Sequence, residues 1–167
     1  MKVELKNVHF SESLSEETNA FTANVYVNGK KCGYAKNDGC GGCTDIRQLG
    51  GVNSKLFVEC VNYLKTQPQI NIGSEKKPYM VDCDMETMVD HLFELWLKDR
   101  DMKKLEKNMK NCLMWGVPYD VTYHYVKFKV KLSDIPHDIL QNKINHYKKD
   151  FKDGEVFLNT NLVGFDL

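Results

Sequence analysis

Apolar and polar residues alternate along the first part of the chain, which is the pattern of β-strands with one buried face. Over residues 2–10 the alternation slips only at Lys6-Asn7, where the change of phase predicts a β-bulge. Residues 21–28 alternate without interruption. The dipeptide Asn28-Gly29 then predicts a type I′ turn, because that turn needs positive φ at both positions. These segments predict antiparallel strands joined by a tight hairpin.

A two-residue turn fixes which residues face each other across the hairpin. Counted outward from the turn, the expected pairs are Val27 with Lys30, Val25 with Cys32, and Ala23 with Tyr34. Cys32 and Tyr34 are therefore predicted to lie on the apolar face. This placement argues against Cys32 as a ligand that faces solvent.

Helical periodicity replaces the alternation in three later segments. Helices are expected over 54–66, over about 84–111 and over about 135–151. The second is the longest, with acids in its first turn and lysines in its last, as the helix dipole favours.

The remaining segments are expected to be strands and connectors. One or two strands are predicted over 114–132, broken near Gly116-Val117-Pro118, and a short strand over 155–160, while 67–81 is expected to be a connector. This order of elements predicts an α+β protein, with an N-terminal antiparallel β-hairpin or sheet packed with about three helices, one of them long. We expect residues 1–167 to form a single domain.

The overall charge weakens two classes of function. Lys plus Arg number 23 and Asp plus Glu number 23, so the formal net charge is zero. A dedicated binder of double-stranded DNA usually carries a basic excess, and a mimic of nucleic acid would carry an acidic one. No apolar run approaches the roughly 18 residues of a membrane span, and the N-terminus lacks the apolar region of a secretory signal. We therefore expect a cytoplasmic protein without a membrane partner.

Residues 37–45 form a glycine-rich loop with three glycines, two cysteines and two aspartates. Successive amides around its glycines can form a nest for an anion such as phosphate, and its carboxylates can hold a divalent ion such as Mg²⁺. The candidate ligand-binding residues are Asp38, Gly39, Gly41, Gly42 and Asp45. Neither a Walker motif nor a dinucleotide fingerprint is present. The same composition also suits a purely structural loop.

Six cysteines without a secretory signal predict free thiols or metal ligands. Cys40 and Cys43 form the single C-x-x-C, which is half of a zinc site, and no second pair of Cys or His has matching spacing. Our expectation is that no cofactor is required, with zinc or magnesium as the ions that the loop would hold. Cys60 lies on a helical apolar stripe and is predicted to belong to the core.

An acidic stripe is expected along the long helix. Glu86, Asp90 and Glu94 are spaced by four residues and share one helix face, beside His91. Such a stripe can bind a metal or a basic partner. It can also be a solvated face on which Glu94 pairs with Lys98, and the Glu-x-x-His spacing of metal sites in helical bundles is absent.

The segment 121–131 alternates as a strand, with Val126, Phe128 and Val130 predicted on the core face. The opposite face carries aromatic and then basic residues: Tyr123, Tyr125, Lys127, Lys129 and Lys131. Such a face can stack bases and follow the phosphates of a single-stranded nucleic acid. The alternative is an edge strand whose lysines prevent aggregation.

Several motifs together resemble a known group of proteins. They are SEETNAF at 15–21, VNGKK at 27–31, and NDG at 37–39 followed by Gly41-Gly42. In these motifs, and through Trp96-Leu97 and 158–162, the chain resembles small uncharacterised proteins encoded by phages and mobile elements of gut bacteria. The resemblance implies a protein that acts on host machinery, including inhibition of a host defence such as a CRISPR effector.

Three functional hypotheses follow, of which the third is a plain structural or scaffolding domain. The first is a non-enzymatic phage or mobile-element protein that binds a host protein or nucleoprotein complex in nucleic-acid processing or defence. The sequence has neither a G-x-S-x-G elbow nor an H-E-x-x-H motif, which favours binding over catalysis. The alternative is a phosphate- or metal-binding enzyme or ligand-binding domain that uses the glycine-rich loop.

Overall fold

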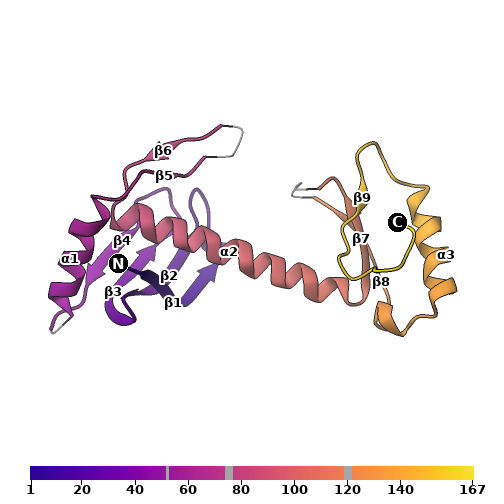
Figure 1. The fold of residues 1–167 in the computed structure, drawn as a ribbon, viewed down its shortest axis with the longest axis horizontal. Coiled ribbons are helices and arrows are strands. Elements are labelled where there is room, and N and C mark those ends of the chain that lie inside the picture. The colour runs from indigo at the N-terminus through magenta and orange to yellow at the C-terminus, as the bar shows by residue number, and fades with distance from the viewer. Residues whose placement is uncertain (52, 74–76, 119–121) are drawn as a thin grey trace. The chain divides into compact units, whose positions relative to one another are not determined.

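A computed structural model describes residues 1–51, 53–73, 77–118 and 122–167 of the chain. The chain divides into two compact units, Met1–Leu97 and Lys98–Leu167. Figure 1 follows the elements along the chain. The predicted α+β class is confirmed, because the described residues form an antiparallel N-terminal sheet and three α-helices, the longest with 25 residues.

The first unit contains a four-stranded antiparallel sheet in the order β1-β2-β3-β4. Its strands are β1 (Val3–Ser11), β2 (Ala20–Val27), β3 (Lys30–Asn37) and β4 (Asp45–Gln48), with a short 3₁₀ helix, η1 (Glu12–Leu14), between the first two. The predicted bulge in β1 is confirmed. The register shifts between Lys6 and His9, and Asn7 has a φ of 50°.

The hairpin between β2 and β3 has the predicted turn. Asn28 and Gly29 have φ values of 46° and 79°, and Val27 pairs with Lys30. Positive φ at both central positions matches the right-handed twist of the strands that the turn joins.

The predicted pairs farther from this turn are wrong by one residue. Val25 faces Gly33 rather than Cys32, and Ala23 faces Ala35 rather than Tyr34. Cys32 is the extra residue of a bulge in β3, which reverses the expected alternation from that point. Cys32 is buried as predicted, whereas Tyr34 is 36% exposed and not on the apolar face.

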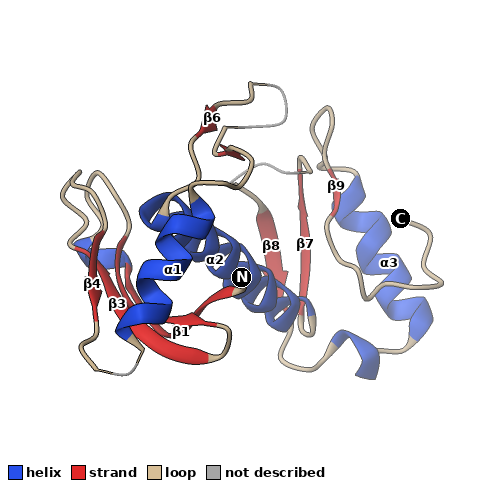
Figure 2. Ribbon diagram, turned by 60° about the vertical axis from the view of Figure 1, so that its left-hand side comes forward, coloured by secondary structure: helices blue, strands red, loops and turns tan. Residues whose placement is uncertain are grey.

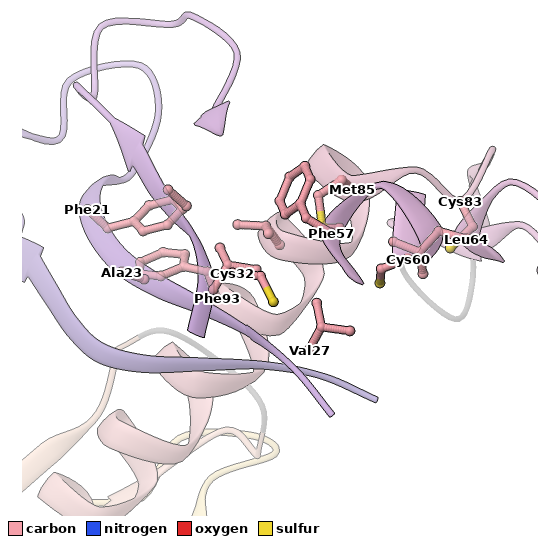
Figure 3. Packing of buried hydrophobic residues seen from close by; sticks show 13 residues of the cluster. Phe21, Ala23, Val27, Cys32, Phe57, Cys60, Leu64, Cys83, Met85 and Phe93 are labelled. Carbon is pink, nitrogen blue, oxygen red and sulfur yellow. The ribbon is translucent and has the colours of Figure 1, made fainter. Parts of the chain in front are cut away.

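Two helices complete the core of the first unit. They are α1 (Ser54–Leu64) and the first part of α2 (Met85–Met109), which begins where the Asp84 carboxylate accepts a hydrogen bond from the Thr87 amide at 2.8 Å. Figure 3 shows Phe21, Ala23 and Cys32 of the sheet packed with Phe57 and Cys60 of α1 and with Phe93 of α2. The Phe93 ring stacks on Phe21 with centroids 4.0 Å apart. The predicted connector contains two short paired strands, β5 (Ile70–Asn71) and β6 (Met80–Val81).

The second unit is built on a three-stranded sheet in the order β8-β7-β9 (Figure 2). Its elements are β7 (Cys112–Gly116), β8 (His124–Lys127), the 3₁₀ helix η2 (Leu132–Asp134), α3 (His137–Lys148) and β9 (Val156–Phe157). Leu113 and Trp115 of β7 point into a core shared with Leu140 and Ile144 of α3. Since side chains alternate along β7, Cys112 and Met114 point to the opposite face of the sheet.

Candidate functional site

The glycine-rich loop is organised around the side chain of Asn37. Its Oδ1 accepts hydrogen bonds from the Gly39 amide and the Thr18 hydroxyl, both at 2.9 Å, and its Nδ2 donates to the Gly42 carbonyl at 3.1 Å. A short polar side chain that binds the backbone two residues later is a common way to fix a turn. The loop therefore has a defined shape.

Gly39 is the residue that this shape requires. Its φ is 87°, and its carbonyl accepts hydrogen bonds from the amides of Glu16, Glu17 and Thr18 at 2.9–3.2 Å. A Cβ at this position would collide with the Leu14 carbonyl oxygen and would lie 2.9 Å from the Ala20 Cβ. Glycine is thus needed both for its backbone angle and for its lack of a side chain.

The amides proposed as an anion nest are largely engaged within the protein. The Gly39 amide donates to Asn37, and the Gly41 amide donates to the Thr18 hydroxyl at 3.2 Å. An anion bound here would have to replace these hydrogen bonds, so the loop is a poorer phosphate site than its composition suggested.

The structure brings the loop and the acidic stripe of α2 together through Thr44, which is 5% exposed. The Thr44 amide donates to Glu86 at 3.0 Å, and its hydroxyl donates to Asp90 at 2.6 Å. Asn19 donates in turn to Glu94 at 3.1 Å. Two carboxylates of the stripe therefore accept hydrogen bonds from Thr44 of the loop, and the third accepts one from Asn19, which precedes β2. The sequence analysis did not predict these hydrogen bonds.

An acidic pocket of about 360 Å³ lies between the loop and the helix. We define it by Gly41, Gly42 and Cys43 on the loop side and by Glu86, Asp90 and Glu94 on the helix side, with Phe21 and Phe93 among its apolar walls. Among the described residues that line it, none is lysine or arginine. Its carboxylates favour a cation over an anion.

Two groups that line the pocket, Asp90 and Cys43, have raised pKa values. Burial raises the pKa of Asp90, and the charges of Glu86, Asp84 and Glu94 raise it further, against the hydrogen bond from Thr44. The pKa of the Cys43 thiol is raised mainly by a hydrogen bond to Glu86 and by the charge of that carboxylate. A raised pKa disfavours the thiolate, which is the form that binds zinc or attacks a substrate.

The other predicted loop ligands surround a separate hollow of about 300 Å³, lined by Asp38, Cys40 and Asp45 together with Lys36 and Arg47. Asp38 pairs with Lys36 at 2.6 Å, and Asp45 pairs with Arg47 at 2.8 Å. Both carboxylates thus have basic partners already. Across the described part of the chain, no three His, Cys, Asp or Glu residues are arranged to hold a metal ion.

A third site lies on the second unit, where Tyr123, Tyr125 and Lys127 form what we call the Tyr–Lys face. Tyr125 and Lys127 lie opposite Met114 and Cys112 of β7, so these four side chains share one face of the sheet. With Tyr123 and Asn108 they surround a cavity of about 230 Å³. The tyrosines are 41% and 61% exposed. Sequence reasoning missed Cys112 and Met114, which the pairing of β7 with β8 identifies, and Asn108 of α2, which the lining of the cavity identifies.

The predicted strand is shorter than expected. β8 ends at Lys127, so Lys129 and Lys131 are exposed but lie beyond it. Val130 is 52% exposed, and its predicted place on the core face is wrong. Beyond β8, the amides of Phe128 and Leu132 still donate to the Asn111 and Lys110 carbonyls. Val121, where the strand was expected to begin, lies outside the described residues.

Comparisons with family models, curated proteins and solved structures find no match to this chain. Within the described residues, no helix has the length and apolar character needed to cross a lipid bilayer. What the molecule does is therefore inferred from its sites and from the motifs of its sequence.

Proposed function

We propose that this chain is a non-enzymatic binding protein of a phage or mobile element that engages a host nucleic-acid-processing or defence complex in the cytoplasm. On this proposal the Tyr–Lys face contacts single-stranded nucleic acid within that complex. Inhibition of a CRISPR-type effector is one such action. The resemblance of the N-terminal motifs supports the phage setting. The observation that carries the nucleic-acid contact is the grouping of two exposed tyrosines and Lys127 around one cavity.

A surface binds a single strand by stacking on its bases and by attracting its phosphates. Bases without a pairing partner gain about 1–3 kcal/mol by stacking on an aromatic side chain, and phosphates are attracted to nearby lysines. Two exposed tyrosines side by side with a lysine provide an aromatic surface for bases and a charge for phosphate. A net charge of zero is compatible with a short local contact rather than a long basic groove.

Variants of the Tyr–Lys face should distinguish the contribution of base stacking to the affinity from the contribution of charge. We expect Tyr125→Ala to weaken binding of a labelled oligothymidine by about 1–3 kcal/mol, with an unchanged salt dependence. Lys127→Ala should instead reduce the slope of log affinity against log salt by about 0.7, the value for one contact with a single strand. Fluorescence anisotropy at several salt concentrations measures both quantities.

The matched control is Lys143→Ala, which removes the same charge from an exposed position on α3. It should leave both affinity and slope unchanged. If the unmutated protein binds no oligothymidine at about 50 mM salt, where electrostatic contacts are strong, the nucleic-acid role is wrong. The Tyr–Lys face would then be a guarded strand edge or a contact for protein.

The acidic pocket favours a second candidate function, that of a ligand-binding domain at the glycine-rich loop. Among the described residues, the donors that these three carboxylates accept from are neutral, so net negative charge remains in a partly apolar hollow. Because the described residues offer no compact metal-ligating group, a larger organic cation, such as the guanidinium of a basic side chain, fits better than phosphate or Mg²⁺.

This candidate predicts a pH-dependent gain of stability from a guanidinium compound. Agmatine should raise the melting temperature more at about pH 7 than at about pH 4, because the raised pKa of Asp90 leaves less of this carboxyl ionised at the lower pH. Asp90→Asn should weaken this pH dependence, and Asp150→Asn, at an exposed site on the other unit, should not. Stabilisation by phosphate but not by agmatine would contradict the assignment.

A further inference from the structure

We infer that the cavity beside the Tyr–Lys face takes one unstacked base of the bound single strand. This inference rests on the proposed function and adds to it which part of the nucleic acid enters the protein. The base would lie within the cavity, and Lys127 at its rim would contact the adjoining phosphate. Base and backbone are then recognised by different residues.

Residues that are paired between β7 and β8 line the cavity together. Met114 is paired with Tyr125, and Cys112 with Lys127, so a buried residue of β7 lies beside each exposed residue of β8. Met114 and Cys112 are 1% and 4% exposed, and they form an apolar floor below the tyrosines. Burial raises the pKa of Cys112, which keeps this thiol in its neutral form. The floor is therefore uncharged and apolar, which suits contact with the ring of a base.

The two tyrosines form a tilted aromatic pair and still leave ring surface open to a ligand. The ring centroids of Tyr123 and Tyr125 are 6.5 Å apart, and their planes are tilted by 56°. With 41% and 61% exposure, both retain open ring surface. The π-face of any base can stack on such a surface, which makes the contact tolerant of sequence.

Asn108 adds a polar group to this otherwise aromatic and apolar site. A carboxamide has both donors and an acceptor, so it can pair with the edge of any base. Within the described part of the chain, the side chain of Asn108 makes no hydrogen bond, nor do the hydroxyls of Tyr123 and Tyr125. These groups can bind a ligand without breaking contacts inside the protein.

The size of the cavity limits what it can hold. Sites for drug-sized ligands occupy about 300–1,000 Å³, and this cavity, at about 230 Å³, is smaller. A single planar heterocycle is of suitable size, whereas two stacked bases are not. Because β8 ends at Lys127, the face offers one lysine directly beside the cavity. The site thus matches one nucleotide in a strand that is otherwise held by its phosphates.

The test compares an oligothymidine with a fully abasic oligonucleotide of the same length, which keeps every phosphate and removes every base. The full-length protein should bind the abasic strand about 5- to 150-fold more weakly, which is the equivalent of about 1–3 kcal/mol for one base contact. The salt dependence should be the same for both strands. A fully abasic strand is needed because a single abasic position allows a neighbouring base to enter instead.

Two variants test whether the difference in affinity between the two strands arises in the cavity. Met114→Phe should fill the floor and bring the affinity for oligothymidine close to that for the abasic strand. Asn108→Ala, on the half-buried rim, gives an independent result that does not depend on repacking the floor. It should lower the affinity for oligothymidine and leave the abasic strand unaffected. Melting curves confirm that each variant is folded.

The outcomes distinguish this inference from the proposed function. Equal affinities for the two strands would show that neither the cavity nor the tyrosines take a base, and the proposed nucleic-acid contact would then be limited to phosphates at Lys127. Absence of binding to either strand would overturn both. If both variants still bind oligothymidine more tightly than the abasic strand, the base lies elsewhere on the Tyr–Lys face. The assignment of the base to the cavity would then be wrong.

Discussion

Gly39→Ala is expected to lower the free energy of unfolding by about 2–6 kcal/mol. Two costs add at this position. A non-glycine residue held at a φ of 87° is strained by about 1–3 kcal/mol. The new methyl group must also displace the Leu14 carbonyl or the Ala20 side chain, and such overpacking costs about 1–3 kcal/mol.

Gly42→Ala is the matched control, since it adds the same methyl group three residues along. A Cβ at Gly42 meets no atom within 4 Å, and Gly42 is not among the glycines with positive φ. The substitution should therefore be neutral or should stabilise by up to about 1 kcal/mol, through a less flexible unfolded chain. Urea unfolding of both variants measures the contrast.

The result bears on the acidic pocket as well as on stability. Gly39 fixes the turn that leads to Thr44, and Thr44 carries the hydrogen bonds to Glu86 and Asp90. If Gly39→Ala and Gly42→Ala destabilise to the same small extent, the loop does not have the packed shape described for it. The pocket between loop and helix would then lose its structural basis.

The sequence was sufficient where local rules determine structure. Asn28-Gly29 predicted its turn, Lys6-Asn7 its bulge, and the helical periodicity over 54–66 its helix. Each of these features depends on residues close together in the chain. The bulge at Cys32 left no comparable signal, and one inserted residue was enough to move Tyr34 to the solvent face. Register depends on the whole sheet, which a local pattern does not contain.

The candidate sites were harder to predict because each is made by contacts across long stretches of sequence. The acidic stripe was visible in the spacing of Glu86, Asp90 and Glu94, but its hydrogen bonds to Thr44 and Asn19 were not. Likewise, Tyr123 and Tyr125 were predicted as an exposed pair, whereas the floor under them comes from β7. A sequence pattern shows which residues share one face of one element. It does not show which other element lies against that face.

Trp115→Ala is expected to destabilise the second unit by about 3–5 kcal/mol, the usual cost of removing a large buried aromatic side chain. Trp115 is 9% exposed and lies in the core of that unit. Its ring stacks near Tyr147 and Phe151, with centroids 5.5 and 6.0 Å apart, and meets Phe157 edge-on. The substitution leaves a cavity between the sheet and α3 that these neighbours can fill only in part.

Tyr125→Ala provides the comparison from the other side of the same small sheet. Tyr125 is 61% exposed and pairs with Met114, whereas Trp115 pairs with His124 on the opposite face. Its removal should change the free energy of unfolding by less than about 1 kcal/mol, although it should weaken oligothymidine binding. Urea unfolding followed by circular dichroism, together with anisotropy, gives both quantities for each variant. If Tyr125→Ala costs as much stability as Trp115→Ala, then Tyr125 is a packing residue and the Tyr–Lys face is not an open binding surface.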